Sequence, residues 1–289
     1  MNHMKHTVLF FFVILLLLSA CNRQNHQDFS GDRAYQFLQT LLAFGPRVPG
    51  AESHEKAATF IKNNLAGNGW SVASQDFQFD QTPLQNIVAT KGNSDTLILI
   101  GTHYDSRAVA DQDNQLENQD DPVLGANDGG SGTAVLLELS RVLEIPENVE
   151  VWLVFFDGED QGKLNGWTWS IGADYFVQQL QRAPSKVLII DMIGDEDLNV
   201  YMEKNSTASL VEEVWNIAKD MDYQTAIIPE YKYAMIDDHL PFINVGYPAA
   251  LLIDFDYPYW HTVEDTIEHV SAKSLQIIGN ILVKWVSEQ

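Results

Sequence analysis

The stretch Val149–Asp160, VEVWLVFFDGED, decides the fold, because a long apolar run ends there in three carboxylates. Residues 151–156 are mostly β-branched or aromatic, which is typical of a strand buried on both faces of a parallel or mixed sheet. Burying the acids that follow is costly unless a cation or a proton relieves their charge. Ligands of open α/β sheets bind at the carboxyl ends of the strands, so the stretch predicts a ligand site, with a solvated acidic turn as the alternative.

Strands and helices alternate on both sides of this stretch. The other predicted strands are 72–79, 86–90, 96–102, 187–193 and 249–253, with a short edge strand at 198–202. The predicted helices are 30–44, where Ser30 is a candidate N-cap, and 53–65, 133–143, 171–181, 208–221 and 275–286. This order predicts a single α/β/α three-layer domain over residues 29–289, with a central mixed, mostly parallel sheet.

The first 21 residues have the pattern of an export signal. A basic start precedes the apolar run 8–18, which is too short to span a bilayer as a folded helix. The run ends in Leu-Ser-Ala-Cys, which resembles a bacterial lipobox and makes Cys21 the predicted lipidation site. We therefore expect an exported bacterial lipoprotein that faces the periplasm or the cell surface and is tethered by residues 22–28. An ordinary secretory signal with an incidental cysteine is the alternative.

The amino-acid composition limits which residues can bind a metal and which classes of partner the protein can bind. Cys21 is the only cysteine, so the mature domain has no disulfide and no thiolate ligand, and any metal must bind His, Asp or Glu. The formal net charge is −23, from 40 acidic and 17 basic residues. This charge argues against nucleic acid as a partner, because binding nucleic acid depends on Lys and Arg that neutralise phosphates. It favours cationic partners such as peptide amino termini, or serves solubility alone.

Residues of metal-ligand type follow several predicted strands. They are His103, Asp105, Glu159, Asp160 and Asp191, together with Asp128 in a glycine-rich turn and His261 in a late loop. Each alone has an ordinary structural explanation, such as a hydrogen-bonded histidine or a helix cap. Together, carboxylates and imidazoles without thiolate favour a catalytic zinc with an open coordination position. The polar loop 106–124 is long enough to be functional or mobile.

The motifs GTHYDSR, GANDGGSGTAVLLELSRVL, FFDGED, IDMIGD, DDHLPF and WHTVEDT occur in this order. In this respect the chain resembles the superfamily that joins zinc aminopeptidases with animal-type glutaminyl cyclases, over the whole of residues 29–289. The resemblance implies a zinc-aminopeptidase-like fold. FFDGE, an Asp in DDHLPF where aminopeptidases usually have Ser, and the Trp before His261 are similar to the cyclase form of these motifs.

The resemblance also implies roles for individual residues. The implied zinc ligands are Asp128, Asp160 and His261, with Asp160 in place of a more usual Glu. Glu159 matches the general acid and base, and Asp191 and Asp237 match two acids of the catalytic centre. Trp260, Tyr257 and either Trp167 or Trp169 are implied in substrate binding, with core packing as the alternative for the tryptophans. His103, Asp105 and His239 are candidates for a second metal or for supporting contacts. A cis peptide is implied at Asp128–Gly129.

The implied activity is a zinc-dependent glutaminyl-peptide cyclotransferase. It would convert the N-terminal Gln of peptides or proteins to pyroglutamate, release ammonia and use one Zn²⁺ per chain. The alternative is an aminopeptidase that holds two zinc ions and removes N-terminal residues. A non-catalytic surface lipoprotein is disfavoured, because every acid and histidine of the motifs is present. In each case the membrane is reached only through the lipid anchor at Cys21.

Overall fold

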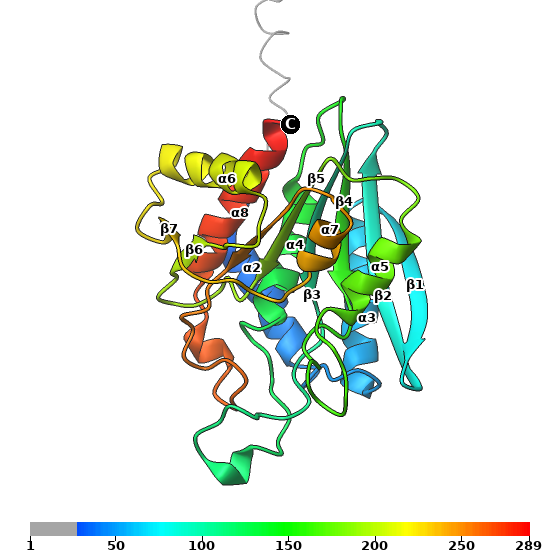
Figure 1. The fold of residues 1–289 in the computed structure, drawn as a ribbon, viewed down its shortest axis with the longest axis vertical. Helices are drawn as coiled ribbons and strands as arrows, with labels where there is room; N and C mark the ends of the chain where they lie inside the picture. Colours follow the sequence, from blue (N-terminus) through cyan, green and yellow to red (C-terminus); the bar gives the residue numbers. More distant parts are fainter. Residues whose placement is uncertain (1–27) are drawn as a thin grey trace, which may run out of the picture.

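The computed structural model describes residues 28–289, which form the ribbon coloured by sequence in Figure 1. The predicted signal peptide with Cys21, and all but the last residue of the predicted tether, lie outside the described residues. No helix within residues 28–289 is long and apolar enough to cross a membrane.

A six-stranded mixed sheet forms the centre of the molecule. Its strands lie in the order β1-β2-β4-β3-β5-β8. Their bounds are Ser71–Phe79 (β1), Thr82–Gly92 (β2), Leu97–His103 (β3), Glu150–Phe156 (β4), Lys186–Asp191 (β5) and Ala249–Ile253 (β8). The pairs β3–β4, β3–β5 and β5–β8 are parallel, whereas β1–β2 and β2–β4 are antiparallel. The prediction of a mixed, mostly parallel sheet is confirmed.

Alternating side chains of the central strands fill two apolar cores. On β3, Ile98 and Ile100 lie in one buried cluster and Leu99 lies in the other. On β4, Leu153 lies in the first cluster and Val154 in the second, because successive side chains of a strand point to opposite faces. Because a strand covered on both faces buries every side chain, its sequence is a continuous apolar run, as in residues 151–156.

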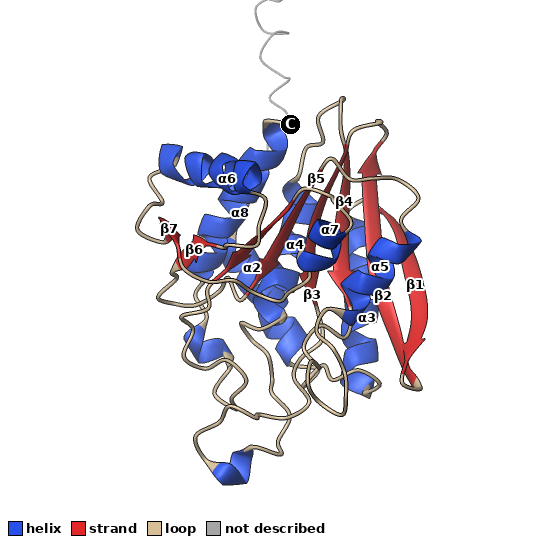
Figure 2. Cartoon of the chain, viewed as in Figure 1, coloured by secondary structure: helices blue, strands red, loops and turns tan. Residues whose placement is uncertain are grey.

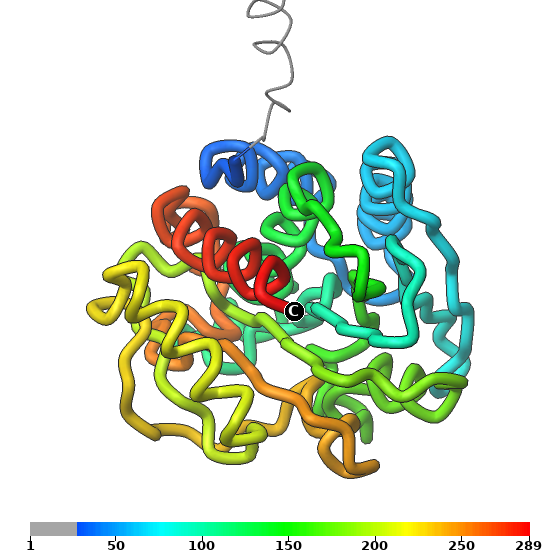
Figure 3. The backbone as a smooth tube through the Cα atoms, turned by 90° about the horizontal axis from the view of Figure 1, so that it is seen from above, coloured from blue at the N-terminus to red at the C-terminus, as the bar shows by residue number. Residues whose placement is uncertain are grey.

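Helices cover both faces of the sheet, which gives the three layers that were predicted (Figure 3). One core contains side chains of α2 (Gly31–Leu42), α3 (Glu52–Gly67), α4 (Gly130–Val142), α6 (Ala208–Asp220) and α8 (Ala272–Ser287). The other contains side chains of α5 (Ile171–Gln179) and α7 (Leu240–Asn244). The Ser30 side chain accepts a hydrogen bond from Arg33 N, so the predicted N-cap of α2 is confirmed.

The C-terminal third differs from the prediction. The segment predicted as an edge strand of the main sheet is β6 (Val200–Met202), and it pairs with β7 (Ile227–Tyr231) in a separate two-stranded parallel sheet. The sequence patterns predict neither β7 nor α7, because both are five residues long and each contains a proline. Such short elements give too few residues for a periodic signal.

The carboxyl ends of the parallel strands lie together at the lower edge of the sheet in Figure 2, where long loops gather. The loop after β3 extends farthest from the sheet and contains a short 3₁₀ helix, Leu116–Asn118. A second 3₁₀ turn, Ile267–His269, precedes α8. The predicted ligands follow β3, β4 and β5 at this edge, as the binding rule for open α/β sheets requires.

Candidate metal centre

Five segments bring buried polar side chains to the carboxyl edge of the sheet. His103 ends β3, Asp191 ends β5 and Asp160 follows β4 by four residues. Asp128 stands in the turn before α4, and His261 lies in the loop that follows β8. All five side chains are buried. The parallel strands end at one edge, so residues more than 150 positions apart in the chain meet there.

Asp128, Asp160 and His261 form one candidate ligand set. Each offers a ligand atom, and these atoms all lie within 4.8 Å of one another. His261 Nε2 is 2.8 Å from Asp160 Oδ1 and 3.7 Å from Asp128 Oδ2. Asp160 Oδ2 is buried and has no hydrogen-bond partner among residues 28–289. Two carboxylates and an imidazole with such an unsatisfied oxygen fit a zinc ion with a fourth position open.

His103, Asp128 and Asp191 form a second set that shares Asp128 with the first. His103 Nε2 lies 3.1 Å from Asp128 Oδ1 and 3.0 Å from Asp191 Oδ1. The other ring nitrogen, Nδ1, lies 3.3 Å from Asp105 Oδ1. Both nitrogens of His103 therefore have hydrogen-bonding carboxylates. The nitrogens of His261 also face carboxylates, Nε2 that of Asp160 and Nδ1 that of Asp111 at 3.3 Å, but neither contact has hydrogen-bond geometry in the described chain.

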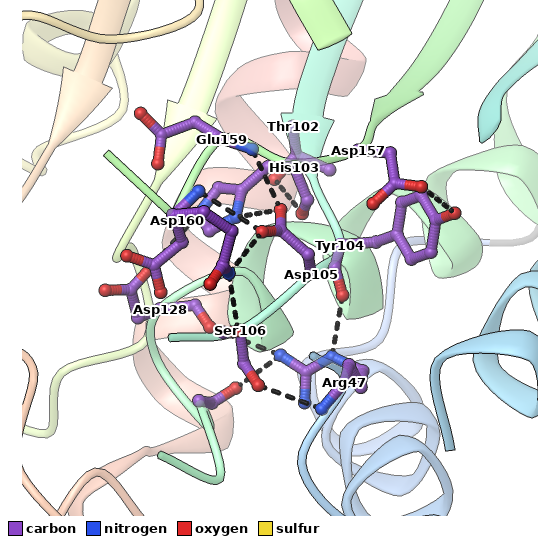
Figure 4. A network of polar contacts seen from close by, with 12 residues as sticks. Arg47, Thr102, His103, Tyr104, Asp105, Ser106, Asp128, Asp157, Glu159 and Asp160 are labelled. Atoms are coloured by element: carbon purple, nitrogen blue, oxygen red, sulfur yellow. Dashed lines mark hydrogen bonds and ion pairs between the residues drawn. The ribbon is translucent and has the colours of Figure 1, made fainter. Parts of the chain in front are cut away.

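Asp105 holds the loop after β4 in place, as Figure 4 shows. Its carboxylate accepts hydrogen bonds from Glu159 N and Asp160 N, both at 3.2 Å, and from the Gln161 side chain at 3.0 Å. Asp105 thus contacts His103 and the backbone of two site residues, and it belongs to neither ligand set.

Asp265 holds the turn that carries Asp128. One oxygen accepts hydrogen bonds from Asn127 N and from the Tyr257 hydroxyl, both at 2.8 Å, and the other accepts from Asp128 N at 3.2 Å. Tyr257 is therefore buried against Asp265 and does not line the cavity beside the ligand set, so its position does not support the predicted role in substrate binding. Asp265 was not predicted, although it stands in the quoted motif WHTVEDT.

Arg47 supplies a buried positive charge beneath the acids (Figure 4). Its guanidinium donates hydrogen bonds to the carbonyl oxygens of Tyr104, Leu124, Gly125 and Asp128. It thereby joins the backbone after β3 to the turn before α4. Sequence patterns assign no role to Arg47, because no local pattern indicates which carbonyl groups an arginine will reach.

A cavity of about 300 Å³ opens onto the first ligand set. Trp260 stacks on His261 with ring centroids 3.8 Å apart, and Trp169 stacks on the same ring at 5.9 Å. Both tryptophans line the cavity, as do Glu159 and Asp237. A larger cavity of about 640 Å³, between α3 and the β1–β2 hairpin, is lined by none of the predicted site residues.

Trp167 lies elsewhere. It lines a different pocket beside Val48 and Pro49 and packs edge-to-face against Phe79, with centroids 5.0 Å apart. Of the two tryptophans that the sequence left open, the structure therefore places Trp169 beside the site.

His239 also lies away from the ligands. It is fully buried, and its Nε2 is 3.2 Å from a Glu203 carboxylate oxygen. Glu203 in turn accepts a hydrogen bond from Met235 N. The candidate role of His239 at a second metal is not supported, because His239 belongs to neither group of convergent ligands among the described residues.

Several acids at the cavity have raised pKa values, whereas that of Asp128 is lowered by His103 although burial opposes this. Burial raises the pKa of Glu159 well above its ordinary value, and the charges of Asp237 and Asp238 add to this effect. Burial likewise raises the pKa of Asp237 well above the ordinary range, and the negative charge of Asp191 raises it further. Burial raises the pKa of Asp238 to about 8. Such a cluster requires shared protons or a bound cation near neutral pH.

The Asp128–Gly129 peptide is trans, so the cis prediction is wrong. The turn is made instead by Gly129, whose φ of 71° and ψ of −29° lie in the left-handed region that glycine adopts readily. A Cβ at this position would collide with the Asp105 carbonyl oxygen and the His103 ring. Glycine therefore lets the turn approach the end of β3 closely.

Comparison with known proteins gives a family match over residues 86–286, to the model described as Peptidase family M28. Among curated relatives, an aminopeptidase of Bacillus subtilis, YwaD, is 27% identical over 232 residues, which cover 73% of this chain and 46% of that protein. The chain thus spans about half the length of that relative. A glutaminyl-peptide cyclotransferase of Drosophila melanogaster is 25% identical over 81% of this chain and 75% of its own length.

Solved structures with the same fold include members of both enzyme classes. A glutaminyl cyclase of Porphyromonas gingivalis is 28% identical, with a TM-score of 0.86 over 91% of this chain and 100% of that one. A Zn-dependent exopeptidase of Parabacteroides distasonis is 26% identical, with the same TM-score and the same coverage. The fold therefore does not by itself distinguish cyclisation from hydrolysis.

Proposed function

This chain belongs to peptidase family M28, and from that membership we propose that it is a zinc-dependent glutaminyl-peptide cyclotransferase. It converts the N-terminal glutamine of peptides or proteins to pyroglutamate and releases ammonia. The observation that carries the proposal is the small cavity in which Trp260 and Trp169 face His261, while the protonatable acids Glu159 and Asp237 line the same space. A confined aromatic pocket suits a glutamine side chain that must fold back on its own amine.

Asp128, Asp160 and His261 would hold one zinc ion. When bound, zinc would supply Lewis-acid polarisation of the glutamine γ-carbonyl. The proposal of a single ion is supported by the hydrogen bonds of the two histidines. His103 is hydrogen-bonded through both nitrogens. In the described part of the chain, the carboxylates near the His261 nitrogens do not have hydrogen-bond geometry, and the buried Asp160 Oδ2 has no hydrogen-bond partner.

Glu159 moves the proton in this proposal. The α-amine nitrogen forms a bond to the γ-carbonyl carbon, and the bond from that carbon to the amide nitrogen breaks. Glu159 takes a proton from the attacking nitrogen and delivers it to the departing one, which leaves as ammonia. A carboxyl whose pKa is raised by burial towards the working pH suits both transfers.

Asp191 and Asp237 orient the substrate. Both are buried, and the charge of each raises the pKa of neighbouring acids, so this wall of the site is strongly negative. It would attract a substrate ammonium group and hold it near Glu159. Met235, Ile236 and Phe255 line the same cavity, and Ile236 is 64% exposed. The residue after the glutamine would leave the pocket along this apolar rim.

The second candidate function is a two-zinc aminopeptidase. The observation that favours it is the set His103, Asp128 and Asp191, which shares Asp128 with the first set as a bridging ligand would. Glu159 would then activate a water molecule for peptide hydrolysis.

One assay distinguishes the two functions. We expect the purified enzyme to release ammonia from peptides that begin with Gln, and to release negligible free amino acid from Leu- or Ala-peptides. Elemental analysis should give close to one equivalent of zinc. Ready cleavage of Leu-peptides without pyroglutamate formation, together with two equivalents of zinc, would establish the aminopeptidase instead.

We also propose that the protein is exported and anchored through a lipid on Cys21, so that it acts on peptide or protein amino termini outside the cytoplasm. The net charge of −23 supports a role without nucleic acid. Cys21→Ser should abolish labelling by a radioactive fatty acid and shift the protein from the membrane fraction to the soluble fraction. Unchanged membrane association in this variant would refute the anchor.

A further inference from the structure

The loop of residues 106–124 is attached to the segment that carries His261. Gln112 N donates a hydrogen bond of 3.2 Å to the carbonyl oxygen of His261. The next residue, Asp113, accepts a hydrogen bond of 3.2 Å from Val263 N. The loop therefore holds the backbone that directly follows the His261 side chain, although it lies about 150 residues earlier in the chain.

The His261 side chain meets the same loop through Asp111. Asp111 Oδ1 lies 3.3 Å from His261 Nδ1, the ring nitrogen that faces away from the other two ligands. The opposite nitrogen, Nε2, lies 2.8 Å from Asp160. A carboxylate at Nδ1 favours the tautomer that keeps a proton there and leaves the Nε2 lone pair free for a metal.

Arg107 holds Asp111 in this position. Its Nε and Nη2 donate to the two oxygens of Asp111 at 3.0 and 2.7 Å, which is a bidentate pair. Its Nη1 donates to the carbonyl oxygens of Asp160 and Gly162 at 3.0 and 2.9 Å. The guanidinium is 2% exposed and lies 5.2 Å from the Trp169 ring. One ion pair thus connects the ring of one ligand with the backbone of another.

The backbone of His261 shows that it needs such support. Its φ is 55°, in the left-handed region that non-glycine residues adopt rarely. A residue keeps this conformation where its surroundings determine it from several directions. Here the surroundings include Gln112 at the carbonyl group, Asp111 at Nδ1 and the Trp260 ring at 3.8 Å.

We propose that Asp111, fixed by Arg107, is a positioning residue that presents His261 Nε2 to the zinc ion. This role rests on the proposed metal centre. It also gives the long loop a function, because the loop carries both members of the pair. Carboxylates that support a metal-bound histidine typically change metal affinity 10- to 100-fold when they are removed.

The test compares Asp111→Asn with Glu150→Gln. Glu150 is also a carboxylate paired with an arginine, Arg182 at 2.8 Å, but it begins β4 at the opposite end of the strand from the site. Full-length protein is stripped of metal and titrated with Zn²⁺ against a chelator of known affinity. We expect Asp111→Asn to weaken zinc binding by about 10- to 100-fold, and Glu150→Gln to stay within about twofold of the unmodified protein.

A spectroscopic readout separates positioning from general stability. Co²⁺ is loaded in place of zinc, and the visible absorption band of Asp111→Asn should shift relative to both other proteins. If Asp111→Asn does not fold, Asp111→Glu keeps the charge and displaces the carboxylate, and its affinity should still fall measurably. Zinc affinity and Co²⁺ spectra that match those of the Glu150→Gln control would overturn the proposal. Failure of the unmodified protein to bind zinc would instead overturn the metal centre itself.

Discussion

At the scale of single residues, neighbouring acids receive different roles from their surroundings. Glu159 and Asp160 are adjacent in the chain, and Asp105 accepts a hydrogen bond from the backbone of each. Asp160 points its carboxylate at His261, whereas Glu159 lines the cavity with Asp237. The first geometry suits a ligand and the second suits a proton carrier.

Glu159→Gln should remove the proton carrier without disturbing the metal. We expect turnover of Gln-peptides to fall by about a hundredfold or more, because general acid–base catalysis contributes about that factor. Zinc content, measured by elemental analysis, should remain near one equivalent. A variant that loses zinc instead would mean that the roles of Glu159 and Asp160 are exchanged, and a variant that keeps its turnover would mean that Glu159 does not carry the proton.

Trp260→Ala should weaken substrate positioning, because its ring stacks on His261 and forms a wall of the cavity. We expect kcat/KM for Gln-peptides to fall by about tenfold or more. Trp167→Ala is the matched control, because it removes the same side chain from a different pocket. Its kcat/KM should stay within about twofold, and equal losses in the two variants would contradict the placement of the tryptophans.

At the scale of elements, the first turn of α4 places Asp128 close to the ends of the strands. Gly132 lies on this turn, and a Cβ there would clash with Thr102 Oγ1 and lie 3.0 Å from the Ile190 carbonyl oxygen. The glycine-rich sequence therefore allows a close approach of α4 to β3 and β5. It has neither the lysine nor the spacing of a phosphate-binding loop.

Gly132→Ala should destabilise the protein by about 1–3 kcal/mol, the usual cost of overpacking a close contact. Gly67→Ala provides the control, because Gly67 ends α3 and a Cβ there has nothing within 4 Å. It should be neutral or stabilise by up to about 1 kcal/mol. The free energy of unfolding in urea measures both. A neutral Gly132→Ala would show that α4 can move away from the sheet without loss.

At the scale of the whole molecule, the fold concentrates like charges in one place. Asp160, Asp191, Asp237 and Asp238 are all buried around one cavity edge, and the only buried arginines beside them, among residues 28–289, are Arg47 and Arg107. Arg47 donates to backbone carbonyl oxygens and Arg107 pairs with Asp111, so neither is directed at this cluster. Near neutral pH the acids share protons with His103 and His261, whose pKa values they raise against the effect of burial, and a bound metal that replaces those protons should stabilise the native state. Removal of the metal should therefore destabilise the entire domain.

Zinc should raise the apparent stability of the protein by mass action. At a free zinc concentration of a thousand times Kd, the gain is about 4 kcal/mol if the unfolded chain does not bind zinc. We therefore expect a chelator to lower Tm and added zinc to restore it. Addition of Mg²⁺ is the control, and it should restore little, because histidine is a poor ligand for it. A Tm that is independent of zinc would argue against a metal centre.

The metal-free protein should become less stable as pH rises. Burial raises the pKa of Asp160 to about 7 and that of Asp238 to about 8, whereas both lie near 4 in an unfolded chain. Between these values the folded state binds more protons than the unfolded state, so the free energy of unfolding falls with pH. Tm of the metal-free protein should thus drop between about pH 5 and pH 8, and Asp238→Asn should reduce that drop. An increase in Tm over this range would contradict the raised pKa values.

The sequence alone determined those features that local patterns encode. The apolar runs before His103, Glu159 and Asp191 predicted buried strands with polar ends, because the burial of a strand on both faces leaves a continuous apolar signal. Because these strands are parallel, their carboxyl ends lie at the same edge of the sheet. The ligand candidates followed from residue type at these positions, and the structure brings Asp128, Asp160 and His261 together.

Only the tertiary structure decided which side chains support the site. Arg107 and Asp111, Asp265 with Tyr257, and the choice of Trp169 over Trp167 depend on contacts between segments that are far apart in the chain. No periodic pattern encodes these contacts, because a loop has no repeating face. The sequence, through its resemblance to a known family, therefore predicted a set of candidate ligands, whereas the tertiary structure decided which side chains hold them in place.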